Sequence, residues 1–193
     1  MKKRVRDPEG KRVSLLEAGL HLADQFGLAN MSVNDVAAGA GVGKGSFYVH
    51  FPDRAAFVLE LHRGFHDNLV AEIRESCAGM TPGLERLTTA ATTYLDTCLR
   101  DRDVRALLLD IRSELNVADE VAARVAQITR LFEQDLRAAR WTDPAPAARL
   151  FTSMCAETSV AELHRGRRDN ALRRSLLRFV CGDGVPAARA SRR

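Results

Sequence analysis

The segment from Ser32 to Arg54 constrains the fold of this chain most, because it reads as two short helices with a glycine turn between them. Ser32 precedes Asp35 by three residues, which is close to the capping-box pattern at the start of a helix. Gly41 can take a positive φ without steric cost, and Pro52 ends the second helix because the residue before a proline is pushed out of the helical region. This arrangement is typical of a helix-turn-helix, whose second helix enters a DNA major groove.

The second helix is predicted over residues 44–51, with an inner and an outer face. At about 100° per residue, Phe47 and Phe51 share a face and are expected to pack inward. The opposite face carries small residues that let the backbone approach base edges, flanked by groups that suit phosphates. The predicted DNA contacts are Lys44, Gly45, Ser46, Tyr48, Val49 and His50, together with Ser32 and Arg54 at the ends of the segment. The alternative is an ordinary helical hairpin in a core, with Tyr48 and His50 merely solvated.

A resemblance to a known family covers this region. The run L-L-E-A-G-L-H-L-A-D-Q-F-G-L-A-N-M-S-V from Leu15 to Val33 is followed by N-D-V-A-A-G-A-G-V-G-K-G-S-F-Y-V-H-F. The sequence resembles the amino-terminal domain of the TetR family of transcriptional regulators, without a gap over about residues 1–60. The most specific part is A-G-V-x-K-G-x-x-Y-x-x-F, from Ala40 to Phe51. Beyond this domain the resemblance extends only to helical character and length.

The resemblance implies roles for individual side chains. It implies that Lys44, Tyr48 and His50 contact the DNA backbone, with Gly45, Ser46 and Val49 in or near the groove. One position departs from the family pattern, because Gly43 stands where the family usually has Ser or Thr. A hydroxyl that would cap the recognition helix or contact a phosphate is therefore missing.

Length and composition are those of an ordinary soluble protein. The chain has 193 residues, of which 46% are hydrophobic and 28% charged, enough for one compound domain or two small ones. No apolar run approaches the roughly 20 residues of a membrane span, and the basic amino terminus has no apolar segment behind it. The four cysteines are scattered without a Cys-x-x-Cys pair, which favours reduced thiols. We therefore expect a cytoplasmic protein that does not bind a membrane.

Charge is distributed unevenly along the chain. Residues 1–12 carry six Lys/Arg and two acids, and residues 162–193 carry nine Arg and three acids, so the remainder sums to −6 for a total of +4. The amino-terminal arm, with Lys2, Lys3, Arg4 and Arg6, suits phosphate contacts that would make binding salt-dependent, or is a solvated tail. The basic carboxy-terminal segment either complements acidic surface on the middle helices or aids solubility.

Apolar residues recur at helical spacing along the chain, and no useful stretch alternates with period two. The first helix is expected over residues 11–26, with Val13, Leu16, Leu20 and Ala23 inward. Further helices are expected from Asp53, as the cap, to the breaker at Gly79, and over about residues 84–98, 104–115, 121–136, 144–165 and 169–181. The inward residues expected in the first of these helices are Ala56, Phe57, Leu61, Phe65, Leu69 and Ile73. Those expected in the second are Leu84, Leu87, Ala91, Tyr94, Leu95 and Cys98. The predicted fold is all-α: a three-helix helix-turn-helix domain over residues 1–60, a helical effector-binding and dimerisation domain over residues 61–185, and a flexible tail over residues 186–193.

Several patterns suggest other chemistry, but each is weak. The segment G-A-G-V-G-K-G-S fails the spacing of a phosphate loop and of a dinucleotide fingerprint. His62 and His66 are one helical turn apart, but no third metal ligand is evident, which favours a solvated or partner-facing pair. Cys98 and Cys155 lie in apolar stripes, as small core residues do. We predict no catalytic residue, no cofactor and no metal site.

The family resemblance implies a homodimeric repressor that a small molecule releases from a palindromic operator. It implies that the last two helices, about residues 144–181, pair with their mates in a four-helix bundle. It also implies a cavity for a small, largely apolar effector of unknown identity, for which the predicted lining is Phe65, Leu69, Tyr94, Cys98, Leu108, Ile111, Phe151 and Met154. Arg112 and Glu114 could anchor a polar group of the effector or form surface ion pairs. Each lining residue could equally be an ordinary core residue.

The alternative functions are an effector-independent activator or architectural DNA-binding protein, and an all-helical enzyme or adaptor that retains the hairpin.

Overall fold

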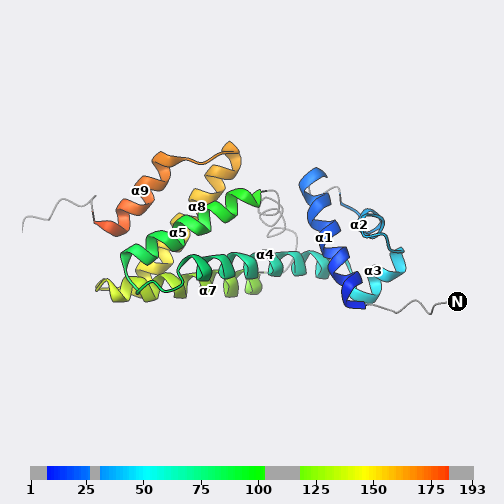
Figure 1. Cartoon of the computed structure of the whole chain (residues 1–193), viewed down its shortest axis with the longest axis horizontal. Helices are drawn as coiled ribbons and strands as arrows, with labels where there is room; N and C mark the ends of the chain where they lie inside the picture. The colour runs from blue at the N-terminus through cyan, green and yellow to red at the C-terminus, as the bar shows by residue number, and fades with distance from the viewer. Residues whose placement is uncertain (1–7, 27–30, 103–117, 183–193) are drawn as a thin grey trace, which may run out of the picture. The chain divides into compact units, whose positions relative to one another are not determined.

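The computed structural model describes residues 8–26, 31–102 and 118–182, and the secondary structure of these residues is helical (Figure 1). The helices are α1 (Pro8–Phe26), α2 (Val33–Gly39), α3 (Lys44–His50), α4 (Arg54–Ser76), α5 (Leu84–Arg100), α7 (Ala118–Ala138), α8 (Pro144–Arg165) and α9 (Asn170–Cys181). The predicted all-α class is confirmed. The helix predicted over residues 104–115, with Leu108, Ile111, Arg112 and Glu114, lies outside the described residues. No helix in the described ranges is long and apolar enough to cross a membrane.

The described helices divide into two compact units. The first contains α1, α2, α3 and α4 as far as Asn68, and the second contains α4 from Leu69, α5, α7 from Glu120, α8 and α9. The division therefore falls within α4, whereas the domain boundary predicted from the sequence was placed at residue 60. The exact limits of the functional domains stay a prediction.

Helix α1 buries a face rotated from the predicted one, although Ala23 is buried as expected and Leu16 is half-buried. Val13 and Leu20 are 44% and 36% exposed, whereas Leu15 and Ala18 are 0% and 9% exposed. The reason lies in close helix packing: a Cβ atom at Gly39 would lie 3.3 Å from the Cβ of Ala18. Small residues allow α2 to approach α1 there, so the buried face includes Ala18 beside Leu15.

Helix α4 buries two adjacent stripes, which corrects the expectation for its histidines. His62 and His66 are 5% and 4% exposed, and their ring centroids are 4.5 Å apart. They follow Val58 at steps of four residues, on a stripe beside the predicted one that contains Phe57 and Leu61. The prediction of a solvated or partner-facing pair is therefore wrong, because the buried face of α4 is wider than one apolar stripe.

The second unit is built around α5. Its predicted apolar stripe is confirmed except at Leu84, which is half-buried, since the following residues are buried: Leu87, Ala91, Tyr94, Leu95 and Cys98. Helix α8 packs along α5, and Phe151 of α8 meets Phe132 of α7 edge to face, with ring centroids 5.1 Å apart. Cys98 and Cys155 are buried free thiols, as predicted. Burial, with a smaller contribution from Cys98, raises the pKa of the Cys155 thiol.

Buried ion pairs join the helices of the second unit. The Arg173 guanidinium of α9 donates to both carboxylate oxygens of Glu162 on α8, at 2.6 Å each, and also to Asp96 on α5. Glu162 is 0% exposed. Burial alone would lower the pKa of Arg173, but the hydrogen bonds and charges of Glu162 and Asp96 outweigh it and raise that pKa. On α7, the buried Asp135 accepts from the Nε of Arg86 at 2.6 Å and from the backbone N–H of Gly83 at 3.0 Å.

Residues that begin or end helices form the turns of the second unit. Helix α8 begins at Pro144 and ends at Arg165, and it is followed by Gly166, whose φ of 64° is the left-handed conformation that glycine takes readily. Helix α9 is capped by the Asp169 carboxylate, which accepts from two backbone N–H groups of its first turn. At the end of α7, Arg140 takes the same left-handed conformation with a φ of 61°, which is unusual for a residue with a side chain.

Candidate nucleic-acid interface

Helix α2 begins with the capping box that the sequence predicts. The backbone N–H of Asp35 donates to the Ser32 hydroxyl at 3.2 Å, and the Ser32 hydroxyl and backbone N–H donate to the Asp35 carboxylate at 2.6 and 3.1 Å. The side-chain hydrogen bond from Ser32, and then the backbone one, lower the pKa of Asp35. The exposed Ser32 hydroxyl already donates its proton within the chain, so a DNA contact from Ser32 would use its oxygen as an acceptor or rearrange the cap.

The turn after α2 depends on Gly41, whose φ is 64°. Its backbone N–H and that of Val42 donate to the carbonyls of Ala38 and Ala37, at 3.0 and 2.9 Å, which closes the end of α2. Gly43 then takes the N-cap position of α3 and supplies no side-chain hydrogen bond. The structure therefore agrees with the sequence analysis that a capping hydroxyl is missing at the start of α3.

The inner face of α3 packs on a cluster of three phenylalanines. Phe47 and Phe51 are 0% and 3% exposed, as predicted, and both rings pack on Phe57 of α4, with centroid distances of 5.2 and 4.9 Å. A helix of seven residues is too short to be stable alone, so this cluster holds α3 in place. It fixes which side of α3 faces outward.

Arg12 of α1 supports the same cluster, a role that was not predicted from the sequence. Its guanidinium lies 5.7 Å from the centroid of the Phe51 ring and donates to Glu60 of α4 at 2.6 Å. In the sequence Arg12 appears only as part of the basic amino-terminal segment. No local pattern links it to a carboxylate so far along the chain, so only the folded arrangement reveals the contact.

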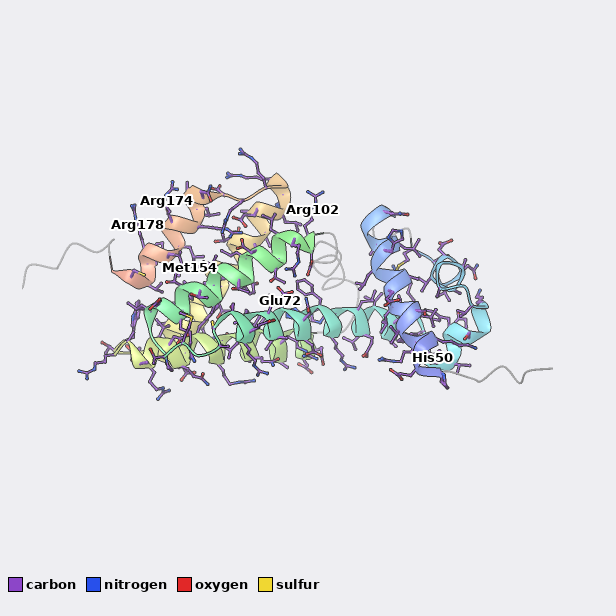
Figure 2. The ribbon with its side chains drawn as sticks, viewed as in Figure 1. His50, Glu72, Arg102, Met154, Arg174 and Arg178 are labelled. Carbon is purple, nitrogen blue, oxygen red and sulfur yellow. The ribbon has the colours of Figure 1, made fainter. Side chains whose placement is uncertain are left out.

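The outer face of α3 exposes most of the residues that were predicted to contact DNA. Val49 is 79% exposed and Tyr48 is 48% exposed. Lys44 and Gly45 are also exposed, whereas Ser46 and His50 are half-buried. A Cβ atom added at Gly45 would meet no atom within 4 Å, so the space beside it is open. The face thus combines a slim apolar centre with a phenol, an imidazole and an ammonium group (His50 is labelled in Figure 2).

Arg54 makes its hydrogen bond away from the outer face of α3. Its Nε donates to the backbone carbonyl of Met31 at 3.3 Å, which ties the start of α4 to the start of α2, and its side chain is half-buried. Asp53 before it accepts from the backbone N–H of Ala56 at 2.7 Å and so caps α4, as expected. A DNA contact from Arg54 stays a prediction.

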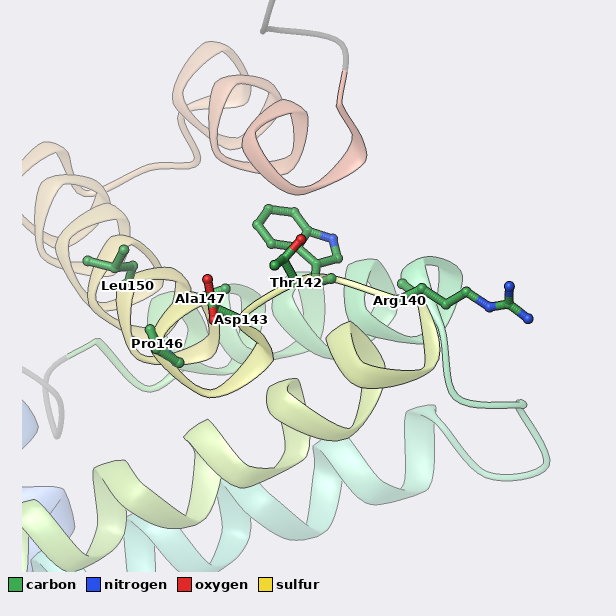
Figure 3. A pocket seen from close by; sticks show the side chains of 8 residues that line it. Arg140, Thr142, Asp143, Pro146, Ala147 and Leu150 are labelled. Atoms are coloured by element: carbon green, nitrogen blue, oxygen red, sulfur yellow. The ribbon is translucent and has the colours of Figure 1, made fainter.

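The residues predicted to line an effector cavity are mostly core residues of the structure. Phe65 is 6% exposed in the first unit. In the second unit Met154 is half-buried, and these side chains are buried: Leu69, Tyr94, Cys98 and Phe151. A hollow of about 600 Å³ lies instead at the turn between α7 and α8 (Figure 3). Its lining includes Trp141, Pro146 and Leu150, and none of the predicted effector residues.

Comparison with known proteins finds a family match for the amino-terminal segment. Residues 15–61 match the model of the family described as "Bacterial regulatory proteins, tetR family". The chain is 30% identical to the HTH-type transcriptional repressor KstR2 of Rhodococcus jostii over 125 residues, 65% of this chain and 61% of that protein. It is 40% identical to KstR2 of Mycobacterium tuberculosis over 77 residues, 40% of this chain and 38% of that protein. The matches thus span about two fifths to three fifths of these curated relatives.

Solved structures resemble nearly the whole chain in fold. A transcriptional regulator from Rhodococcus sp. has a TM-score of 0.75 at 20% identity, covering 93% of this chain and 100% of that one. A TetR family transcription regulator from Marinobacter aquaeolei has a TM-score of 0.67 at 18% identity, covering 92% and 96%. At this identity the likeness concerns the fold alone.

Proposed function

By its amino-terminal domain this chain belongs to the tetR family of bacterial regulatory proteins, and from that premise we propose that it is a sequence-specific DNA-binding transcriptional regulator. In the proposed mode of action it represses by binding a palindromic operator as a homodimer. A small, largely apolar effector then releases it from the DNA.

The outward face of α3 carries this proposal. Phe47 and Phe51 anchor the inner side, which leaves Val49, Tyr48 and Lys44 exposed on a short helix after a glycine turn. A slim helix of this kind fits a major groove, and the phenol and ammonium groups suit the phosphates at its edges. An ordinary helical hairpin would leave Tyr48 solvated as well, so binding to DNA is what distinguishes the two.

A mobility-shift assay on the DNA upstream of its own gene, with wild-type protein and with Lys44→Ala and Tyr48→Ala, tests the proposal. Each change should weaken binding by about 1–2 kcal/mol on every sequence, because a phosphate contact carries no sequence information. Glu85→Ala, at an exposed site on α5, is the control and should bind as the wild type does. Wild-type affinity in the double variant of Lys44 and Tyr48 would contradict the assignment of α3.

The homodimer is proposed to form through α8 and α9. Leu150 and Phe179 support this, because each is 67% exposed and large apolar side chains at the surface favour association. Replacing either residue with Glu should shift the sedimentation coefficient from that of a dimer toward that of a monomer. Val13→Glu, at an exposed apolar site of α1, should not. An unchanged dimer in both α8 and α9 variants would exclude this interface.

The effector is proposed to enter among the helices of the second unit, where Tyr94, Cys98 and Phe151 form part of the core. Binding would shift the equilibrium from the DNA-binding state to the released state. The size of the shift is limited by the difference between the effector's affinities for these two states. A thermal-shift screen of small metabolites, with and without operator DNA, tests this proposal. A releasing effector should stabilise the free protein more than the DNA complex. Hits that stabilise both equally would contradict it.

A further inference from the structure

Val49 occupies the centre of the outward face of α3. At about 100° per residue, it lies opposite the midpoint between Phe47 and Phe51, the two residues that anchor the helix. Its measured exposure agrees with this geometry: Val49 is 79% exposed, while the two phenylalanines are 0% and 3% exposed. No other large hydrophobic side chain among the described residues is as exposed as Val49.

The surroundings of Val49 let it approach a partner closely. Gly45 lies one turn earlier on the same face, and a Cβ atom there would meet nothing within 4 Å. The same is true of Gly43, at the start of the helix. The face is therefore open on the side of Val49 toward the start of the helix, and the side chain of Val49 is free to contact a partner there.

The chemistry of a major groove narrows what this side chain can recognise. A valine has no hydrogen-bond donor or acceptor, so it cannot pair with the polar edges of guanine, cytosine or adenine. The one apolar group in the major groove of unmodified DNA is the 5-methyl of thymine. We propose that Val49 is a specificity-determining residue that packs on a thymine 5-methyl group in each operator half-site. This inference rests on the proposed function.

The size of the effect follows from the burial of one methyl group. Removal of the methyl should weaken binding about fourfold per half-site, which corresponds to about 0.8 kcal/mol. In a two-fold symmetric operator, loss of both methyl groups should weaken binding about fifteenfold if the two half-sites act independently. A variant without the valine side chain should lose the discrimination altogether.

The test begins with the full-length wild-type protein and a random duplex library, from which the bound sequences are selected. In the selected operator each thymine is then replaced by deoxyuridine, which removes the methyl group and keeps every hydrogen-bonding group. Affinities are measured for wild type, for Val49→Ala and for Val125→Ala. Val125 is an exposed valine of α7 and serves as the matched control. The exposed position of Val49 makes loss of folding unexpected, and thermal unfolding of each variant verifies this.

We expect one thymine per half-site at which deoxyuridine weakens binding of wild type and Val125→Ala about fourfold but leaves Val49→Ala unaffected. If every deoxyuridine effect persists in Val49→Ala, or no position shows one, the role of Val49 is overturned while the regulator function stands. If the wild-type protein selects no sequence, the proposed function fails as well. These outcomes separate the two proposals.

Discussion

The two units of this chain stabilise their cores by different means. In the first unit the described buried side chains are apolar apart from His62 and His66, and its centre is the cluster of Phe47, Phe51 and Phe57. All the charged residues that are buried among those described belong to the second unit: Asp135, Glu162 and Arg173. The hydrophobic effect does not depend on the direction of a contact, whereas a buried ion pair stabilises the fold only when its hydrogen bonds have good geometry.

This difference suits the two proposed tasks. A reading helix must be held at a fixed angle by a small unit, and interlocking aromatic rings achieve this with few residues. A unit that pairs with a second copy benefits from helices of fixed register, and directional arginine–carboxylate contacts between α5, α7, α8 and α9 supply it.

Removal of the buried Arg173 should give the largest loss in the free energy of unfolding. Arg173→Met leaves the carboxylate of Glu162 buried without its main partner, which should lower the free energy of unfolding by about 3–5 kcal/mol. Arg174→Met, at the exposed neighbour, should change it by less than about 0.5 kcal/mol. The measurement is urea unfolding followed by circular dichroism. Adding Glu162→Leu to Arg173→Met should recover most of the loss, and equal effects of the two single changes would refute the comparison.

An extra carbon atom in the packed core of the first unit should lower the free energy of unfolding by an intermediate amount. A Cβ atom at Gly19 would lie 2.8 Å from Cε1 of the buried Phe57 ring and closer still to Cζ. Gly19→Ala should therefore destabilise by about 1–3 kcal/mol. Gly64→Ala in α4, where the added carbon meets nothing within 4 Å, should stabilise by about 0.5–1 kcal/mol. Thermal unfolding of both variants decides the matter, and a stable Gly19→Ala protein would show that the aromatic cluster is loosely packed.

A capping hydroxyl should stabilise α3 by a smaller amount. Gly43→Ser places an acceptor at the uncapped start of the helix and restricts the unfolded chain, for a gain of about 0.5–1 kcal/mol. Gly41→Ser, at a φ of 64°, should instead lose about 1 kcal/mol. Amide hydrogen exchange of α3 measures both effects. Equal protection in the two variants would mean that the backbone conformations at these glycines do not govern the helix.

The smallest expected effect concerns pH at the start of α2. Because the pKa of Asp35 is lowered in the folded chain, its carboxylate stabilises the fold above the ordinary pKa of 3.8 and loses this contribution as the pH falls through the lower folded value. Ser32→Ala should move the pKa of Asp35 back toward its ordinary value. An NMR titration of the Asp35 carboxyl carbon measures this shift, and an unchanged midpoint in the variant would exclude Ser32 as the cause.

The sequence predicted the parts of the fold that depend on neighbours in the chain. Ser32 and Asp35 encode the cap of α2, Gly41 encodes the turn, and Phe47 and Phe51 encode the orientation of α3 through helical spacing alone. The apolar stripe of α5 followed in the same way. These features are set within a few residues, so a pattern can reveal them.

The parts that were missed depend on residues far apart in the sequence. Leu15 and Ala18 face inward because small side chains let α2 approach α1, which a list of apolar positions does not reveal. The burial of His62 and the contact between Arg12 and Glu60 arise when α4 is covered on more than one side. Arg173 and Glu162 look like surface charges in the sequence, and only the meeting of α8 and α9 makes them a buried pair.

Trp141, which lines the hollow between α7 and α8, is the one tryptophan of the chain. Its indole is 37% exposed, so its fluorescence should respond to changes at that corner of the second unit. The first unit contains no tryptophan in the sequence up to Asn68. Selective excitation of the indole therefore gives an intrinsic optical signal from one half of the protein, and ligand titrations can be followed without a dye or a label.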